Sequence, residues 1–332
     1  MRAKFQPNFL TLSILSAVIL ANFLPCQGEA TVAFSWAANG AISLIFFLHG
    51  AKLPRATLIA GAMHWRLHLL IFGCTFAMFP LLGLALQPIL SPLVTPTLYT
   101  GVLFLCILPS TIQASITFTA IAKGNVAAAI CSAPASNLLG ILITPLFASL
   151  IFSQHGINHA LWLSSVKQVT LLLLVPFIIG QIACRWLAAS FERHARPLEW
   201  IEQCALPLVA YTAFSEAVVQ GLWSQIAPHS LLGLIVVNGA LLVLALIVTG
   251  YLSKLAGFTQ ADRITILFCG SQRSLASGVA IAQIVFAGYA VGIAILPLLL
   301  FHPMQLIVGS LLAQYYRTRA KPYKLAPLSS RD

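Results

Sequence analysis

Long apolar segments follow one another along almost the whole chain, and this feature restricts the fold most. Ten of them, separated by turn-forming or charged residues, lie at 9–25, 31–50, 66–87, 98–121, 125–152, 161–184, 203–222, 230–252, 263–286 and 289–315. A helix of about 20 mostly apolar residues is long enough to cross the hydrocarbon core of a bilayer. The sequence therefore predicts an all-α membrane protein with ten transmembrane helices.

The composition supports this class and excludes others. Of 332 residues, 59% are hydrophobic and 8% are charged, and the mean hydropathy is +0.94. Soluble domains carry about 25% charged residues, so a cytosolic enzyme is excluded. No paired carboxylates and no Ser/His/Asp set fall at membrane depth, so no enzymatic activity is expected. The seven cysteines form no Cys-x-x-Cys pair, which argues against a disulfide framework or a metal site.

The net charge of +11 is distributed unevenly between the loops. When the N-terminus is placed in the cytoplasm, 16 of the 18 Lys and Arg residues fall on the cytoplasmic side, and the opposite loops carry none. Because cytoplasmic loops are enriched in Lys and Arg, both termini are expected in the cytoplasm. No basic patch is interleaved with aromatic residues, so the expected surroundings are membrane lipid and not nucleic acid. The oligomeric state stays open.

Two of the apolar segments are interrupted in the same way. Cys106 is followed by Pro109 in 98–121, and Cys269 is followed by Gly270 in 263–286. Proline and glycine weaken a helix, so both segments are expected to open at membrane depth. A polar cluster follows each breaker, with Ser110, Thr111, Gln113 and Ser115 in one segment and Ser271, Gln272 and Ser274 in the other.

Interrupted helices at matching places of two halves are the best sequence pointer to the central site of a transporter. Since five is an odd number, a second set of five helices would enter the membrane from the opposite side. We therefore expect two inverted five-helix repeats, at 8–157 and 158–318, and a cytoplasmic tail at 319–332. Of these polar residues, Ser110, Thr111, Gln113 and Ser274 are expected to bind the solute. The alternative is that the side chains of the clusters join helices or bond their own backbone.

Two charged residues lie deep in the apolar segments. Arg273 falls near the middle of 263–286, and Glu216 is the carboxylate within 203–222. A charge at this depth is costly and indicates a functional site by default. We expect Arg273 to contact a solute and Glu216 to be its partner or a proton carrier, with a structural ion pair as the alternative. His49 is a further candidate solute ligand, and His302 is expected to pack or to relay protons.

Four motifs resemble the bile acid:sodium symporter family, also named solute carrier family 10. They are Phe47–Leu53, Leu108–Ser115 with the hinge Ala122–Ala127, Tyr211–Ala217 and Phe268–Ala276. The likeness covers about 8–318 and is closest to the branch of member 7 and its bacterial relatives. It implies a panel domain of helices 1, 2, 6 and 7 and a core domain of helices 3–5 and 8–10. It also implies crossing of broken helices 4 and 9, alternating access to a crevice between the domains, and a bacterial inner membrane location.

The resemblance also implies sodium sites behind the crossing. The candidate ion-binding residues on or beside the matching positions are Ser115, Gln272, Ser271, Thr75 and Ser132. However, the sodium-binding Glu of the family falls on Phe268, and Arg273 stands next to Gln272. A fixed cation within several Å repels sodium by about 1–4 kcal/mol at intermediate dielectric, so two sodium ions in the usual places are not expected. No other cofactor or metal is expected.

The sequence thus predicts a secondary transporter of a small, anionic organic solute, coupled to sodium or protons. The alternative is a regulatory membrane protein of calcium or sodium homeostasis that moves no organic solute.

Overall fold

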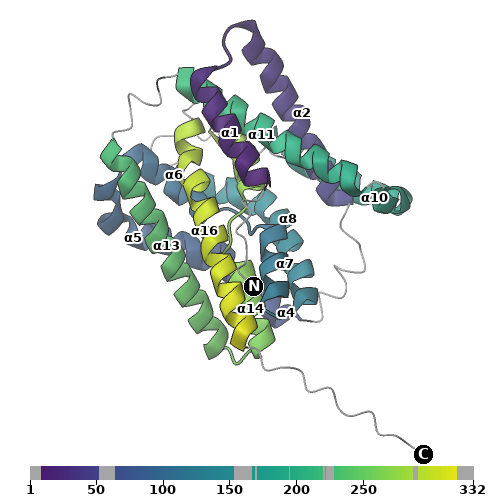
Figure 1. Cartoon of the computed structure of the whole chain (residues 1–332), viewed down its shortest axis with the longest axis vertical. Coiled ribbons are helices and arrows are strands. Elements are labelled where there is room, and N and C mark those ends of the chain that lie inside the picture. The colour runs from purple at the N-terminus through teal and green to yellow at the C-terminus, as the bar shows by residue number, and fades with distance from the viewer. Residues whose placement is uncertain are drawn as a thin grey trace, which may run out of the picture.

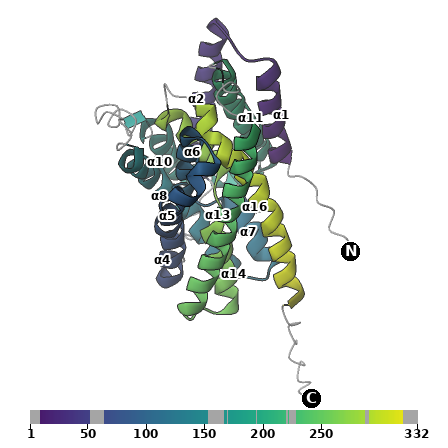
Figure 2. The ribbon, with the colours of Figure 1, turned by 90° about the vertical axis from the view of Figure 1, so that its left-hand side faces the viewer.

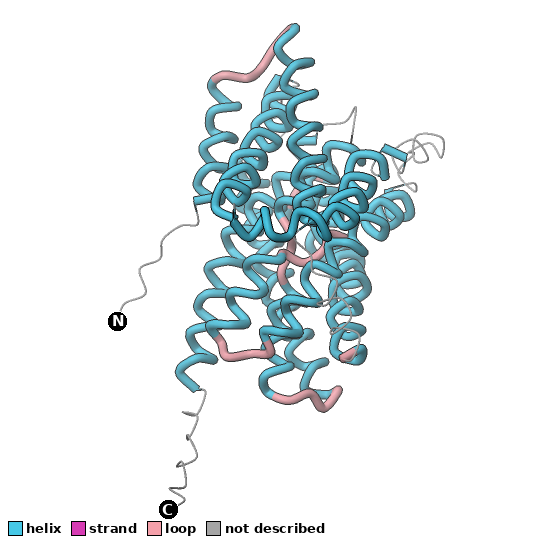
Figure 3. Tube along the Cα trace, turned by 90° about the vertical axis from the view of Figure 1, so that its right-hand side faces the viewer, coloured by secondary structure: helices cyan, strands magenta, loops and turns pink. Residues whose placement is uncertain are grey.

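The computed structural model describes residues 9–51, 64–152, 167–168, 170–193, 195–219, 221, 228–286 and 291–319. Up to residue 152 the helices are α1 (Phe9–Phe23), α2 (Glu29–Ala51), α4 (Trp65–Gly73), α5 (Phe79–Leu90), α6 (Pro96–Cys106), α7 (Ile112–Ile121) and α8 (Val126–Phe152). Then follow α10 (Val175–Arg193), α11 (Ala195–Val219), α13 (Pro228–Leu255), α14 (Gln260–Ser271), α15 (Leu275–Val285) and α16 (Val291–Arg319). These described residues contain helices and no strands, which confirms the all-α class (Figure 3).

Seven helical runs in the described residues are long and apolar enough to cross a membrane. They are Glu29–Ala51, Trp65–Leu93, Val126–Ile151, Thr170–Leu187, His229–Leu255, Gln260–Val285 and Val291–Arg319. Large apolar side chains are exposed on them, with Trp36 75% and Leu232 68% accessible. Such surfaces suit lipid and not water. The chain is therefore an integral membrane protein.

The described parts of the predicted apolar segments are mainly helical, but those at 9–25, 98–121 and 203–222 lie on apolar helical stretches shorter than these seven runs. The count of ten crossings and the inverted repeat stay predictions. The expected boundary between repeats at 157–158 and the tail beyond 319 lie outside the described residues.

The helices gather into two groups. In one group, α1 packs on α11, and α2 packs on both α10 and α11. In the other, α16 packs on α6, α13 on α14, and α7 on α8. Figure 1 shows α1, α2, α10 and α11 together in the upper half, with α13 and α14 farther to the left and below, and Figure 2 agrees from the side for α1, α2 and α11. The groups meet through α11, which contacts α15 and α16.

Both predicted interruptions are present in the second group. The chain leaves helical geometry after α6 and resumes it at Ile112, and it does so again between Ser271 and Leu275. Pro109 explains the first break, since it has no N–H to donate. The second segment also opens as predicted, but α14 continues through Gly270 and the break lies at 272–274.

Gly270 serves packing instead of breaking the helix. A Cβ atom at this position would lie 3.0 Å from Cys74 Cβ and 3.2 Å from Thr249 Cγ2. The missing side chain thus lets α14 lie close to α13 and to the π-helical turn η1 (Cys74–Met78).

The first group is held by an unusually close contact between α2 and α10. A Cβ at Gly50 would lie 2.1 Å from the Phe177 carbonyl oxygen, and a Cβ at Gly180 would lie 2.1 Å from that of Phe47. Small residues on facing helices allow such backbone approach in membrane proteins. The contact fixes the end of α2 that carries His49.

Candidate functional site

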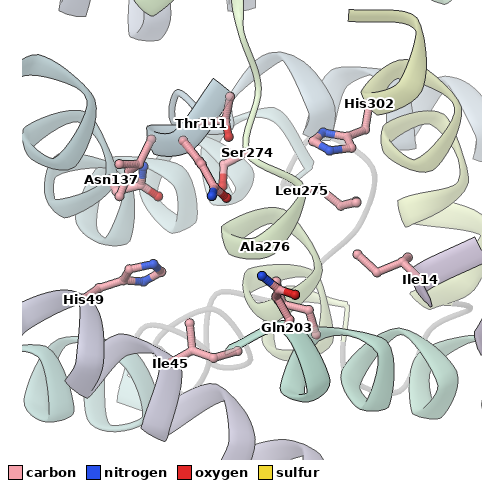
Figure 4. Close-up of a pocket in the computed structure, with 13 residues that line it drawn as sticks. Ile14, Ile45, His49, Thr111, Asn137, Gln203, Ser274, Leu275, Ala276 and His302 are labelled. Atoms are coloured by element: carbon pink, nitrogen blue, oxygen red, sulfur yellow. The ribbon is translucent and has the colours of Figure 1, made fainter. Parts of the chain in front are cut away.

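A cavity of about 120 Å³ lies where the two helix groups face each other. The polar side chains that line it are His49, Thr111, Gln113, Asn137, Gln203, Ser274 and His302. Figure 4 shows His49 of α2 and Gln203 of α11 on one side, and Thr111, Ser274 and His302 across from them. The structure therefore brings together four of the predicted solute-binding residues: His49, Thr111, Gln113 and Ser274.

Two helix N-termini open into this cavity. Residues 111–113 and 274–276 line it, and these are the starts of α7 and α15. The first N–H groups of a helix have no acceptor within the helix and carry a partial positive charge. The Ser274 hydroxyl accepts the N–H of Ser277 at 3.2 Å, whereas the Thr111 side chain makes no such bond. The start of α7 thus keeps donors that suit an anion.

The two breaks are joined through the main chain. The N–H of Ser274 donates to the carbonyl oxygen of Pro109 at 2.9 Å. Ser110 lies beside this bond and is fully buried, with its N–H donating to the Ser136 hydroxyl at 3.1 Å. Ser110 was predicted to bind solute, but it does not line the cavity. Its polar groups hold the break instead.

Asn137 of α8 connects both breaks with one amide group. Its Nδ2 donates to the Ser110 carbonyl at 2.6 Å, and its Oδ1 accepts a short hydrogen bond from the Ser277 hydroxyl. Nδ2 also reaches the Ala133 carbonyl of its own helix at 3.3 Å. The residues that supply these donors and acceptors are all buried, so the arrangement is rigid.

Arg273 lies at the centre of the second break but points away from the cavity. It is 0% exposed and is not among the lining residues. Its guanidinium donates to the carbonyls of Gln272 at 2.9 Å and Gly270 at 3.3 Å, and it stacks on the Phe79 ring at 3.7 Å. The expected contact between Arg273 and a solute is therefore not built into this conformation.

Gln305 of α16 holds the backbone of Arg273. Its Oε1 accepts the Arg273 N–H at 2.7 Å, and its Nε2 donates to the Arg273 carbonyl at 2.8 Å. Nε2 also lies 2.9 Å from Nδ1 of His302, which lines the cavity. Gln305 thus links the backbone of the break to the cavity wall.

The five candidate ion ligands are all buried, and three of them hydrogen-bond to other groups of the chain. Ser132 bonds His68 of α4 at 2.7 Å and the Ala128 carbonyl at 2.8 Å. Ser271 donates to the Leu267 carbonyl of its own helix at 2.6 Å. Ser115 contacts the Ser110 hydroxyl at 3.2 Å. Among the five, the side-chain oxygens of Thr75 and Gln272 have no hydrogen-bond partner in the described chain.

The surroundings of Phe268 are apolar. Its ring lies 5.7 Å from the Phe118 ring, and both belong to a buried cluster that includes Ala122, Ile264 and Ala313. The Phe268 carbonyl, and not its side chain, meets the Ser115 hydroxyl at 3.4 Å. Where the resemblance places a carboxylate, this chain thus offers a hydrophobic contact, which does not fit a sodium ligand.

Glu216 lies on α11 and is partly buried, but it does not line the cavity. It is also not among the groups that contact Arg273. The structure therefore separates the two charges that the sequence analysis treated as partners. Arg273 lies in the candidate span Gln260–Val285, whereas Glu216 lies on the shorter apolar stretch Gln203–Val219 of α11.

Three residues of this region were not recognised as site residues from the sequence: Asn137, Gln203 and Gln305. Each is an amide in or beside an apolar segment, and a polar group at such depth is a signal in itself. His302 was considered but assigned mainly to packing, yet it lines the cavity. Ile14 and Ile45 form an apolar part of the cavity wall, and nothing in the sequence distinguishes them from other apolar residues of their segments.

The whole described region matches known proteins. Residues 8–318 match the model of the SBF-like CPA transporter family. An uncharacterised protein of Pseudomonas aeruginosa is 53% identical over 318 residues, which cover 96% of this chain and 95% of that protein. The Escherichia coli protein YfeH, which carries the name of a symporter, is 42% identical over 97% of this chain and 96% of its own. Sodium/bile acid cotransporter 7-B of Xenopus laevis is 30% identical, covering 97% of this chain and 96% of its own.

Proposed function

Because the chain belongs to the SBF-like CPA transporter family, we propose that it is a secondary transporter of a small organic anion that works by alternating access. It is a membrane transporter and not an enzyme, and the names of its relatives agree on transport. Its proposed location is a bacterial inner membrane, with both termini in the cytoplasm.

The observation that carries the choice of an anion is the pair of helix starts at the cavity. The N-termini of α7 and α15 converge there with His49 and His302, and no carboxylate of the described chain lines the cavity. Positive partial charges and free N–H donors stabilise a carboxylate, sulfonate or phosphate group. Ile14, Ile45 and Leu206 offer apolar surface to the remainder of the solute.

The place of the cavity supports alternating access. It lies between a group made of α1, α2, α10 and α11 and a group that contains both breaks. Discontinuous helices at a central site, with one bundle moving against another, are the usual design of secondary transporters. A movement of this kind would expose the cavity to each side of the membrane in turn. The proposed driving force is a gradient of sodium or protons.

A binding screen followed by counterflow tests the function. Purified protein is heated with a panel of organic anions, each compared with its salt-matched control, because a ligand of the folded state raises the melting temperature. Anions that raise it are then tested for counterflow in proteoliposomes. We expect at least one anion to do both, and an imposed sodium or proton gradient to accelerate its uptake.

Gln113→Leu removes a polar lining group and is expected to weaken the binding of such an anion by about 10-fold. Thr100→Val, on α6 and away from the cavity, is the matched control, since its hydroxyl only bonds the Pro96 carbonyl of its own helix. A different result would favour the alternative, a regulatory membrane protein of calcium or sodium homeostasis. In that case no anion is bound or exchanged, and the purified protein changes the calcium or sodium flux through another membrane protein.

A further inference from the structure

Arg273 is the polar side chain of the crossing that the solute site leaves without a role. It is fully buried but does not line the cavity. A cation within a bilayer is costly unless nearby groups compensate its charge. In the described chain no carboxylate contacts the guanidinium, so the compensation comes from carbonyl groups and from the Phe79 ring.

The carbonyls that bind Arg273 are those that the break sets free. The N–H of Ser274 would bond the Gly270 carbonyl if α14 continued, but it donates to Pro109 of the other break instead. The guanidinium takes this carbonyl at 3.3 Å and that of Gln272 at 2.9 Å. Carbonyls at a helix C-terminus carry a partial negative charge. A positive charge is therefore held at the end of α14.

The end of α6 lies near the same place, because Cys106 is its last residue and is close to Arg273, as is Cys74, but their neutral thiols add no negative charge. The face of the Phe79 ring closes the pocket at 3.7 Å from the guanidinium carbon, a cation–π contact. The guanidinium thus already places a positive charge at the end of α14.

Free carbonyls and C-terminal ends of half-helices are the groups with which discontinuous helices bind coupling ions such as sodium. We propose that Arg273 is a tethered cation that takes the place of a coupling sodium ion at the crossing, so that the transporter needs no sodium gradient. This inference rests on the proposed function and narrows its driving ion to the proton.

The first test compares cations on the purified wild-type protein. Replacing choline chloride with sodium chloride at equal ionic strength is expected to leave the melting temperature unchanged, because the ion's place is occupied. A rise that is specific to sodium would overturn the proposal. This measurement reports stability and not flux, so its outcome is independent of whether an organic anion is found.

The second test separates charge from volume. Arg273→Lys keeps the charge, and Arg273→Met keeps much of the volume without the charge. We expect Arg273→Met to lose about 5 °C or more and Arg273→Lys to lose clearly less. If Arg273 only filled space, the melting temperature of Arg273→Met would equal or exceed that of Arg273→Lys, since a buried charge without a role destabilises the protein. That order would contradict the tethered cation.

The third test supplies the charge from outside. Arg273→Ala leaves room beside Phe79 for a free guanidinium ion. Guanidinium chloride at millimolar concentration, far below denaturing levels, is expected to raise the melting temperature of this variant compared with the same concentration of choline chloride. Wild type and Arg66→Ala, which removes an exposed arginine of α4, are expected to show no such rise. A folded Arg273→Ala protein that guanidinium does not stabilise would refute the proposal. If this variant does not fold, the first two tests decide.

Discussion

Asn137 shows how much of the bonding between the two breaks depends on a single side chain. Its amide reaches Ser110 in one break and Ser277 at the start of α15. Asn137→Leu would leave the buried Ser110 carbonyl without its donor and the Ser277 hydroxyl without an acceptor for its proton, which costs about 1–3 kcal/mol for each group. We therefore expect a loss of about 2–6 kcal/mol in the free energy of unfolding, measured by denaturation in detergent.

The control for this variant is Thr100→Val, which is expected to change stability by less than about 0.5 kcal/mol. Asn137→Leu with wild-type stability would show that the bonds across the crossing are not held in solution. Protease sensitivity between α6 and α7 gives a second measure, because loss of the tie frees the chain around Ser110.

The sequence identified which polar residues lie at depth, but not where their side chains point. Helical periodicity predicts a direction only for residues within a helix, and Arg273 lies in a break. Its direction depends on the carbonyls of Gly270 and Gln272, which become available only when Ser274 bonds Pro109. Asn137 was missed for the related reason that its partners come from two distant segments.

At the scale of elements, the contact between α2 and α10 offers a sharp test. Gly50→Ala places a methyl group on the Phe177 carbonyl oxygen, whereas a Cβ at Gly40 of the same helix meets nothing within 4 Å. Overpacking of this kind costs about 1–3 kcal/mol. We expect Gly50→Ala to lower the melting temperature and to weaken anion binding, because His49 moves with the helix.

Gly40→Ala is the matched control and is expected to be neutral or slightly stabilising, since alanine favours a helix by about 1 kcal/mol over glycine. Equal melting temperatures for the two variants would mean that α2 and α10 are not packed as closely as the structure shows.

The two predicted helix breakers differ in how far the sequence alone determines their effect. Pro109 interrupts its helix because the missing N–H and the ring are local properties. Gly270 only weakens a helix, and here the neighbouring Cys74 and Thr249 require the small residue within intact α14. The break itself is placed at 272–274 by tertiary bonds, which no local pattern reports.

At the scale of the whole molecule, opening to both sides is the property to test. In a background with the accessible Cys26, Cys184 and Cys204 replaced by serine, Thr111→Cys places a thiol on the cavity wall. Alternating access predicts that membrane-impermeant maleimide labels it in right-side-out and in inverted vesicles. A bound anion is expected to slow both reactions.

Leu98→Cys is the control for reagent leakage, because this residue of α6 is 0% exposed and away from the cavity. Its thiol is expected to react from neither side. Labelling of Thr111→Cys from one side only, under every condition, would contradict the proposed movement.

The all-helical membrane class followed from hydropathy alone, because apolar length is a local property. The grouping of α1 and α2 with α10 and α11 did not, since it depends on contacts between segments more than a hundred residues apart. A family resemblance implied that grouping, and the packing of Gly50 against α10 gives it a physical cause.

The bond from Ser274 to Pro109 has a consequence for how this protein can diverge. Because both partners are peptide groups, every replacement of Ser274 except proline retains the donor, and every replacement of Pro109 retains the acceptor. Mutation can therefore vary the side chains around the pocket while the bond between the two breaks persists. A fold with this tolerance can change the solute that it binds through substitutions that leave the fold intact.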